Sequence, residues 1–284
     1  MNNQNQKNNH TSHFNPINKQ VNSYKMPLYG NNQTKTNYSE VPAIVIKKIS
    51  VIIPAYNEEK RIRQTLLSVN NFLAKQTLAY EIIVVNDGSR DNTKQVVLDL
   101  MPQIANLSLI DNLHNYGKGW VTKEGMLHCS GDIRIFMDAD NSTKIEEINK
   151  MLPYFYKGFQ IVVGSRRISG SHVAISQGAL RDFLGAVFRL IVHTIVPVNI
   201  RDTQCGFKAF TARAAKEVFK RQTIFRWAFD VEILAIARKL NFNIKEVPIT
   251  WFNDSESHVK FMGEVLMLVE ILKTRLNLWM GKYR

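Results

Sequence analysis

Apolar runs and amphipathic stretches alternate along the chain from residue 48 to residue 167. Short runs rich in β-branched residues are typical of buried parallel strands, which we expect at 49–56, 80–89, 107–111, 132–140 and 159–166. Apolar residues at helical spacing predict helices between them, at 57–76, 89–101, 117–129 and 142–155. This order predicts an α/β protein whose mostly parallel open sheet carries helices on both faces.

The second half of the chain is less regular. We expect a helix at 179–196, a short strand or loop at 200–210, two helices at 211–221 and 230–242, and a strand at 243–251. The last residues predict a long amphipathic helix near 257–280, whose apolar positions form one stripe: Phe261, Val265, Leu268, Leu272, Leu276 and Trp279. Such a helix either packs against the sheet or lies in a membrane interface, and the same choice applies to 179–196.

Capping residues set the expected helix starts. Asp91 or Asn92 is the expected N-cap of the second helix. A capping box beginning at Ser142 or Thr143 is expected to start the fourth helix.

Composition divides the 284 residues into three parts. Residues 1–42 are rich in Asn, Gln, Ser and Thr, so we expect a disordered tail without a secretory signal. Residues 43–252 form the predicted folded domain, and 253–284 the C-terminal helix. No convincing membrane span is present, because the best candidate, 183–200, is interrupted by charged and proline residues.

The net charge of +13 suggests an anionic partner, such as nucleic acid, a phosphorylated substrate or an anionic membrane. A basic nucleic-acid-binding protein is one alternative, but no recognised nucleic-acid motif supports it. The two cysteines, Cys129 and Cys205, belong to no metal-ligand pattern and predict reduced thiols in a reducing compartment.

Polar residues follow four of the predicted strands, at Tyr56–Glu58, Asp87–Ser89, Asp138–Asp140 and Ser165–Arg166. Ligands of open α/β sheets bind outside the carboxyl ends of the strands, so we expect these residues to converge on one crevice. Asp138 and Asp140 are suited to holding Mg²⁺ or Mn²⁺, which prefer oxygen ligands. The competing interpretation is a solvated helix start, favoured by the helix dipole.

Other segments each have two interpretations. The turn after Asp87 suits recognition of a nucleoside or is only a β-turn, and Lys118 between two glycines offers a charge to phosphate. Arg166 and Arg181 suit phosphate binding, whereas a solvated charge is the better interpretation of Arg167. The segment "RWAFDVEIL" predicts either a helix cap with a buried tryptophan or part of a pocket.

In combination, the motifs resemble family-2 glycosyltransferases with the GT-A fold. The resemblance is strongest to the dolichyl-phosphate β-glucosyltransferases and related polyprenyl-phosphate glycosyltransferases. It covers roughly residues 48–252 and rests on motifs in the family order: "VIIPAYNEEKRI", "EIIVVNDGSRDNT", "GKG", "MDADNSTK", "VVGSR", "RDTQCGFKAF" and "RWAFDVEIL".

The resemblance implies a role for each matching residue. The donor nucleotide pocket would comprise Pro54, Ala55, Tyr56, Glu58, Asp87, Lys118, Asp138 and Ala139. Asp138 and Asp140 would bind the metal, with Asp140 as the principal ligand. The acceptor and sugar pocket would comprise Arg166, Arg181, Gln204, Trp227 and Asp230. The residues expected to take part in catalysis are Asp138, Asp140, Arg166, Arg181 and Asp230.

The resemblance also implies the reaction, a metal-dependent inverting transfer of a sugar, expected to be glucose, from a UDP-sugar to a polyprenyl or dolichyl phosphate. The expected location is cytoplasmic, peripheral on the cytoplasmic face of a membrane. Family members usually carry a membrane anchor, and none is evident here, so a soluble acceptor stays an alternative. A GDP-mannose donor is another.

Overall fold

The computed structural model describes residues 44–173, 190–192, 194–196, 198–252 and 261–284, with side chains of the last segment from 266 onward. The tail predicted at 1–42 and most of the helix predicted at 179–196 lie outside these residues. Arg181 lies outside them too.

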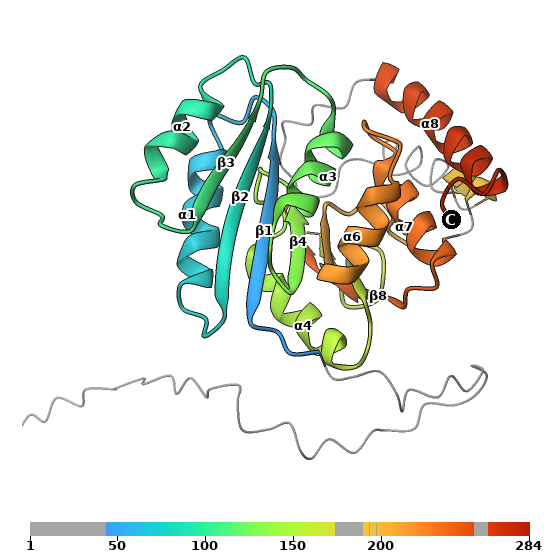
Figure 1. Ribbon diagram of the computed structural model, residues 1–284, viewed down its shortest axis with the longest axis horizontal. Coiled ribbons are helices and arrows are strands. Elements are labelled where there is room, and N and C mark those ends of the chain that lie inside the picture. The colour runs from blue at the N-terminus through green and yellow to red at the C-terminus, as the bar shows by residue number, and fades with distance from the viewer. Residues whose placement is uncertain (1–43, 174–189, 193, 197, 253–260) are drawn as a thin grey trace, which may run out of the picture. The chain divides into compact units, whose positions relative to one another are not determined.

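Within the described residues, seven strands form one sheet in the order β3-β2-β1-β4-β7-β5-β8 (Figure 1). All pairs are parallel except those of β7, which runs antiparallel between β4 and β5. A separate pair of short strands, β6 and β9, is also parallel. The strands are β1 (Lys48–Ala55), β2 (Ala79–Asp87), β3 (Leu107–Asn112), β4 (Ile133–Met137), β5 (Ile161–Ser165), β6 (His172–Val173), β7 (Phe207–Thr211), β8 (Ile244–Pro248) and β9 (Thr250–Trp251).

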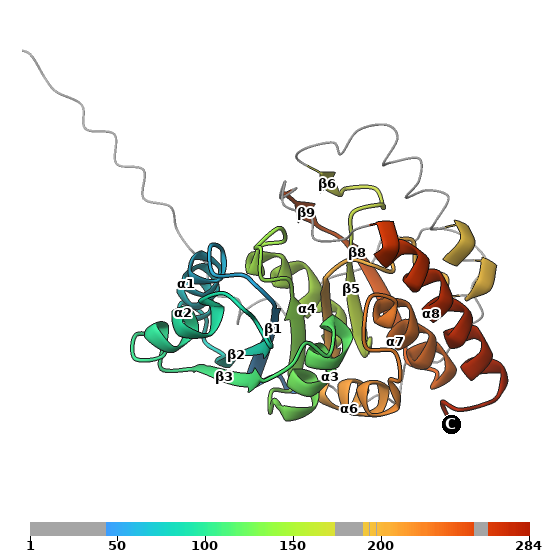
Figure 2. The ribbon, with the colours of Figure 1, turned by 90° about the horizontal axis from the view of Figure 1, so that it is seen from above.

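Helices cover both faces of the sheet, as the alternating pattern predicts. One buried cluster joins the sheet to α1, α2 and α4, and the other joins the opposite face to α3, α6 and α7 (Figure 2). The helices are α1 (Ile62–Leu73), α2 (Thr93–Leu100), α3 (Lys118–His128), η2 (Ile145–Glu147), α4 (Ile148–Tyr156), α6 (Ala212–Arg221), α7 (Phe229–Lys239) and α8 (Phe261–Trp279). The predicted mostly parallel α/β fold is therefore confirmed.

Alternate β1 residues supply the two apolar layers. Ile52 belongs to the cluster with α3, whereas Val51 and Ile53 belong to the cluster with α1. This division follows from the period of a strand, in which successive side chains point to opposite faces. α7 is buried from Phe229 to Ala237 because it lies between the sheet and α8 (Figure 2). It contacts α8, and the ring of Phe229 lies against Phe136 of β4.

One of the two predicted helix starts needs correction. The predicted capping box at Ser142 or Thr143 is wrong, because the segment starts as the 3-10 helix η2 with Lys144 as its N-cap residue. Asn92 is the N-cap position of α2 but makes no side-chain cap hydrogen bond. Asp91 instead accepts from the backbone N–H of Thr93 at 3.0 Å, which is a capping interaction made one residue earlier.

The topology brings several chain segments to one edge of the sheet. The parallel strands β1, β2, β4 and β5 end there, and the antiparallel β7 begins there. The residues just before β7 therefore join the strand-end residues. No helix in the described part of the chain is long and apolar enough to cross a bilayer.

Candidate active site

The acidic pair Asp138 and Asp140 lies in the turn directly after β4. The hydroxyl of Thr65, on α1, donates to the backbone oxygen of Ala139 at 2.7 Å. Asp140 Oδ1 accepts from the backbone N–H of Ser142 at 2.9 Å, and Asn141 adopts a left-handed backbone with φ of 55°. The turn is thus held from both sides, so the positions of the two carboxylates are defined by the fold.

Two residues distant in sequence contact Asp138. Lys118 Nζ lies 2.6 Å from Asp138 Oδ1. A Cβ atom added at Gly206 would lie 2.1 Å from Asp138 Oδ2, so only glycine permits this approach. Sequence reasoning missed Gly206 as an individual residue, because only the antiparallel placement of β7 brings it against the end of β4.

The negative charges of the carboxylates at the site repel one another. The pKa of Glu58 is raised to about 7. Burial is the largest cause, and the charges of Asp140 and Asp138 also raise this pKa, whereas the ion pair with Arg61 lowers it. Burial and the charge of Asp138 also raise the pKa of Asp140. A bound cation would relieve this repulsion.

The residues of this turn fit Mg²⁺ or Mn²⁺. Asp138 and Asp140 offer hard oxygen ligands, and Asn141 Oδ1 is buried without a hydrogen-bond partner among the described residues. Nowhere among the residues that the structure describes is a group of three or more His, Cys, Asp or Glu side chains placed to hold a metal ion. A cation here would therefore take one or two carboxylates and complete its shell with phosphate oxygens and water.

Lys118 keeps its charge in this setting. Burial lowers the pKa of the Lys118 ammonium, but the carboxylates of Asp138 and Asp230 outweigh it and raise the pKa above its usual value. The site edge therefore holds a permanent cation beside the acidic pair, suited to an anionic ligand.

Asp87, predicted to contact the nucleoside, is buried and holds the loop before α3. Its Oδ1 accepts from the N–H of Tyr116 at 2.7 Å, and its Oδ2 accepts from the N–H of Gly117 at 3.0 Å. Burial raises the pKa of Asp87, against those hydrogen bonds, which lower it. Asp87 thus orders the loop that leads to Lys118.

An aromatic group flanks this loop and was not anticipated from the sequence. The ring centroids of Tyr116 and Trp120 lie 5.4 Å apart, and those of Trp120 and Phe225 lie 4.9 Å apart. Gly117, with φ of 102°, permits the close approach of Phe225. Helical spacing of Tyr116 and Trp120 was the only sequence signal for the group.

The predicted residues around β1 differ in exposure. Pro54 and Ala55 are buried within the strand, whereas Tyr56 is 38% exposed. The following turn is joined to the turn after β2, since the N–H of Asn57 donates to Ser89 Oγ at 2.9 Å. Two of the four strand ends predicted to converge, those of β1 and β2, are therefore connected directly.

Arg166, predicted to bind phosphate, is paired within the protein. Its guanidinium donates through Nε and Nη2 to the two oxygens of Asp202, at 2.7 and 2.9 Å. Burial raises the pKa of Asp202, but the bonds and charge of Arg166 outweigh it and lower the pKa. This bidentate pair orients Arg166 and occupies part of its hydrogen-bonding capacity.

Three of the predicted acceptor residues, Gln204, Trp227 and Asp230, lie near β7 and α7. Lys208, fully buried on β7, pairs with Asp230 and also donates to the backbone oxygen of Cys205. Gln204 Nε2 lies 2.9 Å from Met267 Sδ of α8. The N–H of Trp227 donates to Glu270 Oε2, also on α8, at 3.1 Å. Sequence reasoning missed Lys208 and Glu270.

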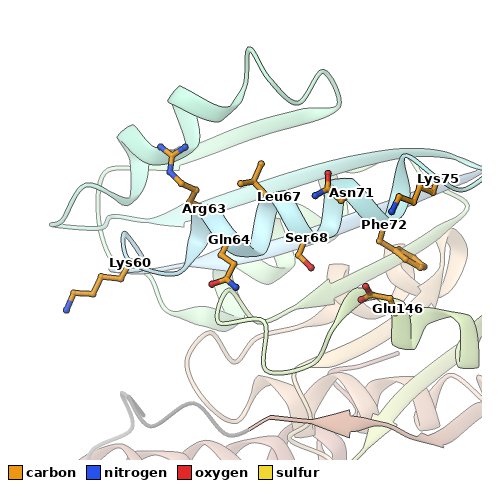
Figure 3. Close-up of a pocket in the computed structure, with 9 residues that line it drawn as sticks. All are labelled: Lys60, Arg63, Gln64, Leu67, Ser68, Asn71, Phe72, Lys75 and Glu146. Atoms are coloured by element: carbon orange, nitrogen blue, oxygen red, sulfur yellow. The ribbon is translucent and has the colours of Figure 1, made fainter. Parts of the chain in front are cut away.

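A separate hollow of about 620 Å³ runs along α1 (Figure 3). Its lining contains none of the predicted site residues and consists of Lys60, Arg63, Gln64, Leu67, Ser68, Asn71, Phe72, Lys75 and Glu146. The acidic pair and its partners stand outside this hollow, so we place the site at the strand ends.

Comparisons with known proteins show to which family the chain is similar. Residues 50–219 match the family described as glycosyl transferase family 2. A dolichyl-phosphate beta-glucosyltransferase of Trichomonas vaginalis is 34% identical over 280 residues, covering 92% of this chain and 84% of its own. The dolichyl-phosphate beta-glucosyltransferase of Mus musculus is 34% identical over 84% of this chain and 78% of its own.

Solved structures share the fold at lower identity. Glucosyl-3-phosphoglycerate synthase from Mycobacterium tuberculosis, in complex with Mn²⁺, UDP and glucosyl-3-phosphoglycerate, has a TM-score of 0.60 at 17% identity. That match covers 81% of this chain and 79% of the other. Mannosyl-3-phosphoglycerate synthase from Rubrobacter xylanophilus has a TM-score of 0.60 at 15% identity, covering 83% of this chain and 75% of its own.

Proposed function

This chain belongs to glycosyltransferase family 2, and from that premise we propose that it transfers glucose from UDP-glucose to dolichyl phosphate. The observation that carries the proposal is the 34% identity to a dolichyl-phosphate beta-glucosyltransferase along 92% of the chain. The site supports it, because an acidic pair and a retained lysine charge stand together at the strand ends.

The chemistry follows from the two substrates. An oxygen of the acceptor phosphate forms a bond to C1 of glucose, with inversion, while the bond between C1 and the UDP oxygen breaks. The electron pair of the broken bond leaves on UDP. Because a phosphate oxygen is already ionised near neutral pH, the attack requires little help from a general base. The main tasks of the protein are to position the acceptor and to stabilise the departing diphosphate.

The chain's own residues divide these tasks. Asp138 and Asp140 would hold Mg²⁺ or Mn²⁺, which supplies Lewis-acid stabilisation of the diphosphate when bound. Lys118 Nζ, already 2.6 Å from Asp138, adds a second positive charge near the leaving group. The acceptor side would comprise Arg166, Gln204, Trp227 and Asp230, together with Arg181, which lies outside the described residues.

The donor side would be the pocket predicted from the sequence. It consists of Pro54, Ala55, Tyr56, Glu58, Asp87, Lys118, Asp138 and Ala139. Asp87 contributes by ordering the loop before α3, through the hydrogen bond that it accepts from Tyr116. The proposed catalytic domain is 43–252, with 253–284 as a C-terminal helix and 1–42 as a separate tail.

The reaction must take place at a membrane surface, because the donor is water-soluble and the acceptor is a lipid. We assign it to the cytoplasmic face, where a reducing compartment suits the free thiols of Cys129 and Cys205. Peripheral association is the corresponding mode of attachment.

The test is a transfer assay with dolichyl phosphate in detergent. UDP release is expected with UDP-glucose and Mn²⁺, and Asp140→Ala should abolish it together with metal-dependent UDP binding. Turnover only with GDP-mannose, or only with a soluble sugar acceptor, would contradict the proposal. UDP binding that survives Asp140→Ala unchanged would contradict the metal assignment.

A further inference from the structure

The outward side of α8 is apolar. Four of its residues and the residue that directly follows the helix are between 48% and 85% exposed: Val269, Leu272, Leu276, Trp279 and Met280. Their spacing of three and four places them on one face of the helix. The opposite face is buried, with Met267 and Ile271 packed in the cluster that includes α7. The stripe predicted from the sequence therefore points outward at Leu272, Leu276 and Trp279. We call these five residues the outer face of α8.

Basic residues border the outer face. Lys273 and Arg275 are exposed, and at 100° per residue they fall on its two edges. Lys282 and Arg284 follow, both exposed. The nearby acid Glu270 turns inward, where it accepts from the backbone N–H groups of Trp227 and Ala228. Among the side chains described from 266 onward, the outward positions thus carry positive charge only.

Such a face is unusual on a soluble surface. Single exposed apolar residues need no explanation, and Leu98 on α2 is one. A contiguous apolar face bordered by charge marks an interaction site. An apolar face with basic edges suits a lipid surface, since the apolar side chains enter the acyl boundary while the cations reach anionic headgroups.

We propose that the outer face of α8 docks on the surface of an anionic lipid bilayer. This docking rests on the proposed function, because it would serve to bring the enzyme to an acceptor that is a membrane lipid. A second copy of this chain is a poorer occupant, because a two-fold contact between these faces would bring Lys273 and Arg275 of both copies together.

The inner side of α8 connects this docking face to the acceptor side of the site. Glu270 Oε2 accepts from the N–H of Trp227 at 3.1 Å and from that of Ala228 at 2.9 Å. Asn277 Nδ2 donates to Thr223 Oγ1 at 3.1 Å. One helix therefore carries the lipid-facing residues and holds the start of α7, so docking fixes how the acceptor side stands relative to the bilayer.

Vesicle sedimentation of the full chain tests the proposal, without donor or acceptor present. The protein should bind phosphatidylcholine vesicles containing phosphatidylserine. Leu276→Ser with Trp279→Ser should weaken that binding roughly tenfold or more, since two large apolar contacts are lost. Lys273→Gln with Arg275→Gln should weaken it about fivefold per cation, and only for anionic vesicles. Leu98→Ser, on α2, is the matched control and should bind as the unaltered chain does.

Several outcomes would overturn the proposal. One is that the unaltered chain does not bind vesicles. Another is that both double variants bind vesicles as strongly as the unaltered chain does, while their melting curves show that they are folded. A dimer that both double variants dissociate, without any vesicle binding, would assign the face to a second copy. An assay of glucose transfer to a short, water-soluble polyprenyl phosphate distinguishes a failure of the proposed function from a failure of the proposed docking. The absence of transfer alongside vesicle binding refutes the proposed function, and its presence without vesicle binding refutes only the docking.

Discussion

Asp138 is positioned by residues that lie far from it in the sequence. Lys118 pairs with one of its oxygens, and Gly206 leaves room for the other. Neither neighbour belongs to the D-x-D motif itself. At the scale of single residues, the site therefore depends on contacts that the motif does not reveal.

Replacing Gly206 tests this dependence. Gly206→Ala would put a Cβ atom 2.1 Å from Asp138 Oδ2, so the carboxylate or β7 must move. We expect UDP binding in the presence of Mn²⁺ to weaken by about tenfold or more, since small displacements of catalytic groups are costly. Isothermal titration calorimetry measures the change.

Gly170→Ala is the control for that substitution. Gly170 also has a positive φ, of 89°, but among the described residues an added Cβ would come within 4 Å of Pro248 alone, at 3.5 Å. The control should lose roughly 1 kcal/mol of stability from backbone strain and keep its UDP affinity. Equal losses of UDP affinity in both variants would contradict the role of Gly206.

We expect Glu81 to make a contribution to stability that is lost in acid. Burial raises the pKa of Glu81, but hydrogen bonds from Ser50, Ser130 and Lys48 outweigh it and lower the pKa to about 2, from an ordinary value of 4.5. A carboxylate whose pKa is lower in the folded state than in the unfolded state stabilises the fold at pH values above its unfolded-state pKa. For Glu81 this stabilisation is lost as the pH falls from about 4.5 through 2.

Glu81→Gln should therefore destabilise the protein at pH 7 and leave it little changed at pH 2. We expect a loss of about 1–2 kcal/mol, reduced from the full linkage value because the carboxylate is partly exposed. Urea unfolding across this pH range measures it, with the exposed Glu146→Gln as control. A constant difference between Glu81→Gln and the unaltered chain at all pH values would refute the linkage.

At the scale of elements, β7 and α7 are joined by a buried ion pair. Lys208 of β7 is fully buried and pairs with Asp230 at the start of α7. Burial raises the pKa of Asp230, against Lys208 and Lys118, which lower it. Removing only one partner of such a pair leaves an uncompensated charge in the core.

Lys208→Met should thus cost about 3–5 kcal/mol of folding free energy. The double variant Lys208→Met with Asp230→Leu should recover much of that loss, because no buried charge is left unpaired. Denaturant unfolding of the single and double variants measures the coupling. Additive losses would show that the two side chains act independently.

α8 and α7 are joined by Glu270. Glu270→Ala removes the acceptor of the N–H groups of Trp227 and Ala228, so we expect a loss of about 1–2 kcal/mol in stability. Because Trp227 belongs to the proposed acceptor pocket, KM for the lipid phosphate should rise while UDP affinity stays unchanged. Steady-state kinetics with calorimetry separates the two quantities.

Two comparisons accompany that variant. Glu217→Ala on α6 serves as the control, because Glu217 pairs with Arg221 four residues on. It should change neither the KM for the lipid phosphate nor the UDP affinity. Glu270→Gln keeps a side-chain oxygen acceptor and should restore most of the acceptor KM. A fall in UDP affinity equal to the rise in KM would indicate general loosening of the fold.

At the scale of the whole molecule, ligand binding should stabilise the fold. A donor that binds only the folded state adds about 2.7 kcal/mol at a hundredfold excess over its Kd. For a domain of this size we expect a rise in Tm of roughly 5–10 °C with UDP-glucose and Mn²⁺. Thermal-shift measurements with UDP- and GDP-sugars, with and without Mn²⁺, identify the donor. A larger shift with GDP-mannose would indicate a different nucleotide preference.

The sequence alone was sufficient to predict the α/β fold and the sheet edge at which the candidate site residues meet. Periodicity of apolar residues is a local property, so the strands and helices from 48 to 167 are readable without the fold. Because parallel strands end at one edge, the polar residues after β1, β2, β4 and β5 could be placed together. The ordered motifs indicated the family, and the match to residues 50–219 confirms it.

Only the tertiary structure decided which partners these residues have. The antiparallel β7 lies between two strands that precede it, and so Gly206 meets Asp138 while Lys208 meets Asp230. The structure likewise pairs Arg166 with Asp202 and turns the stripe of α8 outward. These are contacts between residues far apart in the chain. Local patterns show that a side chain is polar or apolar, but its neighbours are set only when distant segments pack together.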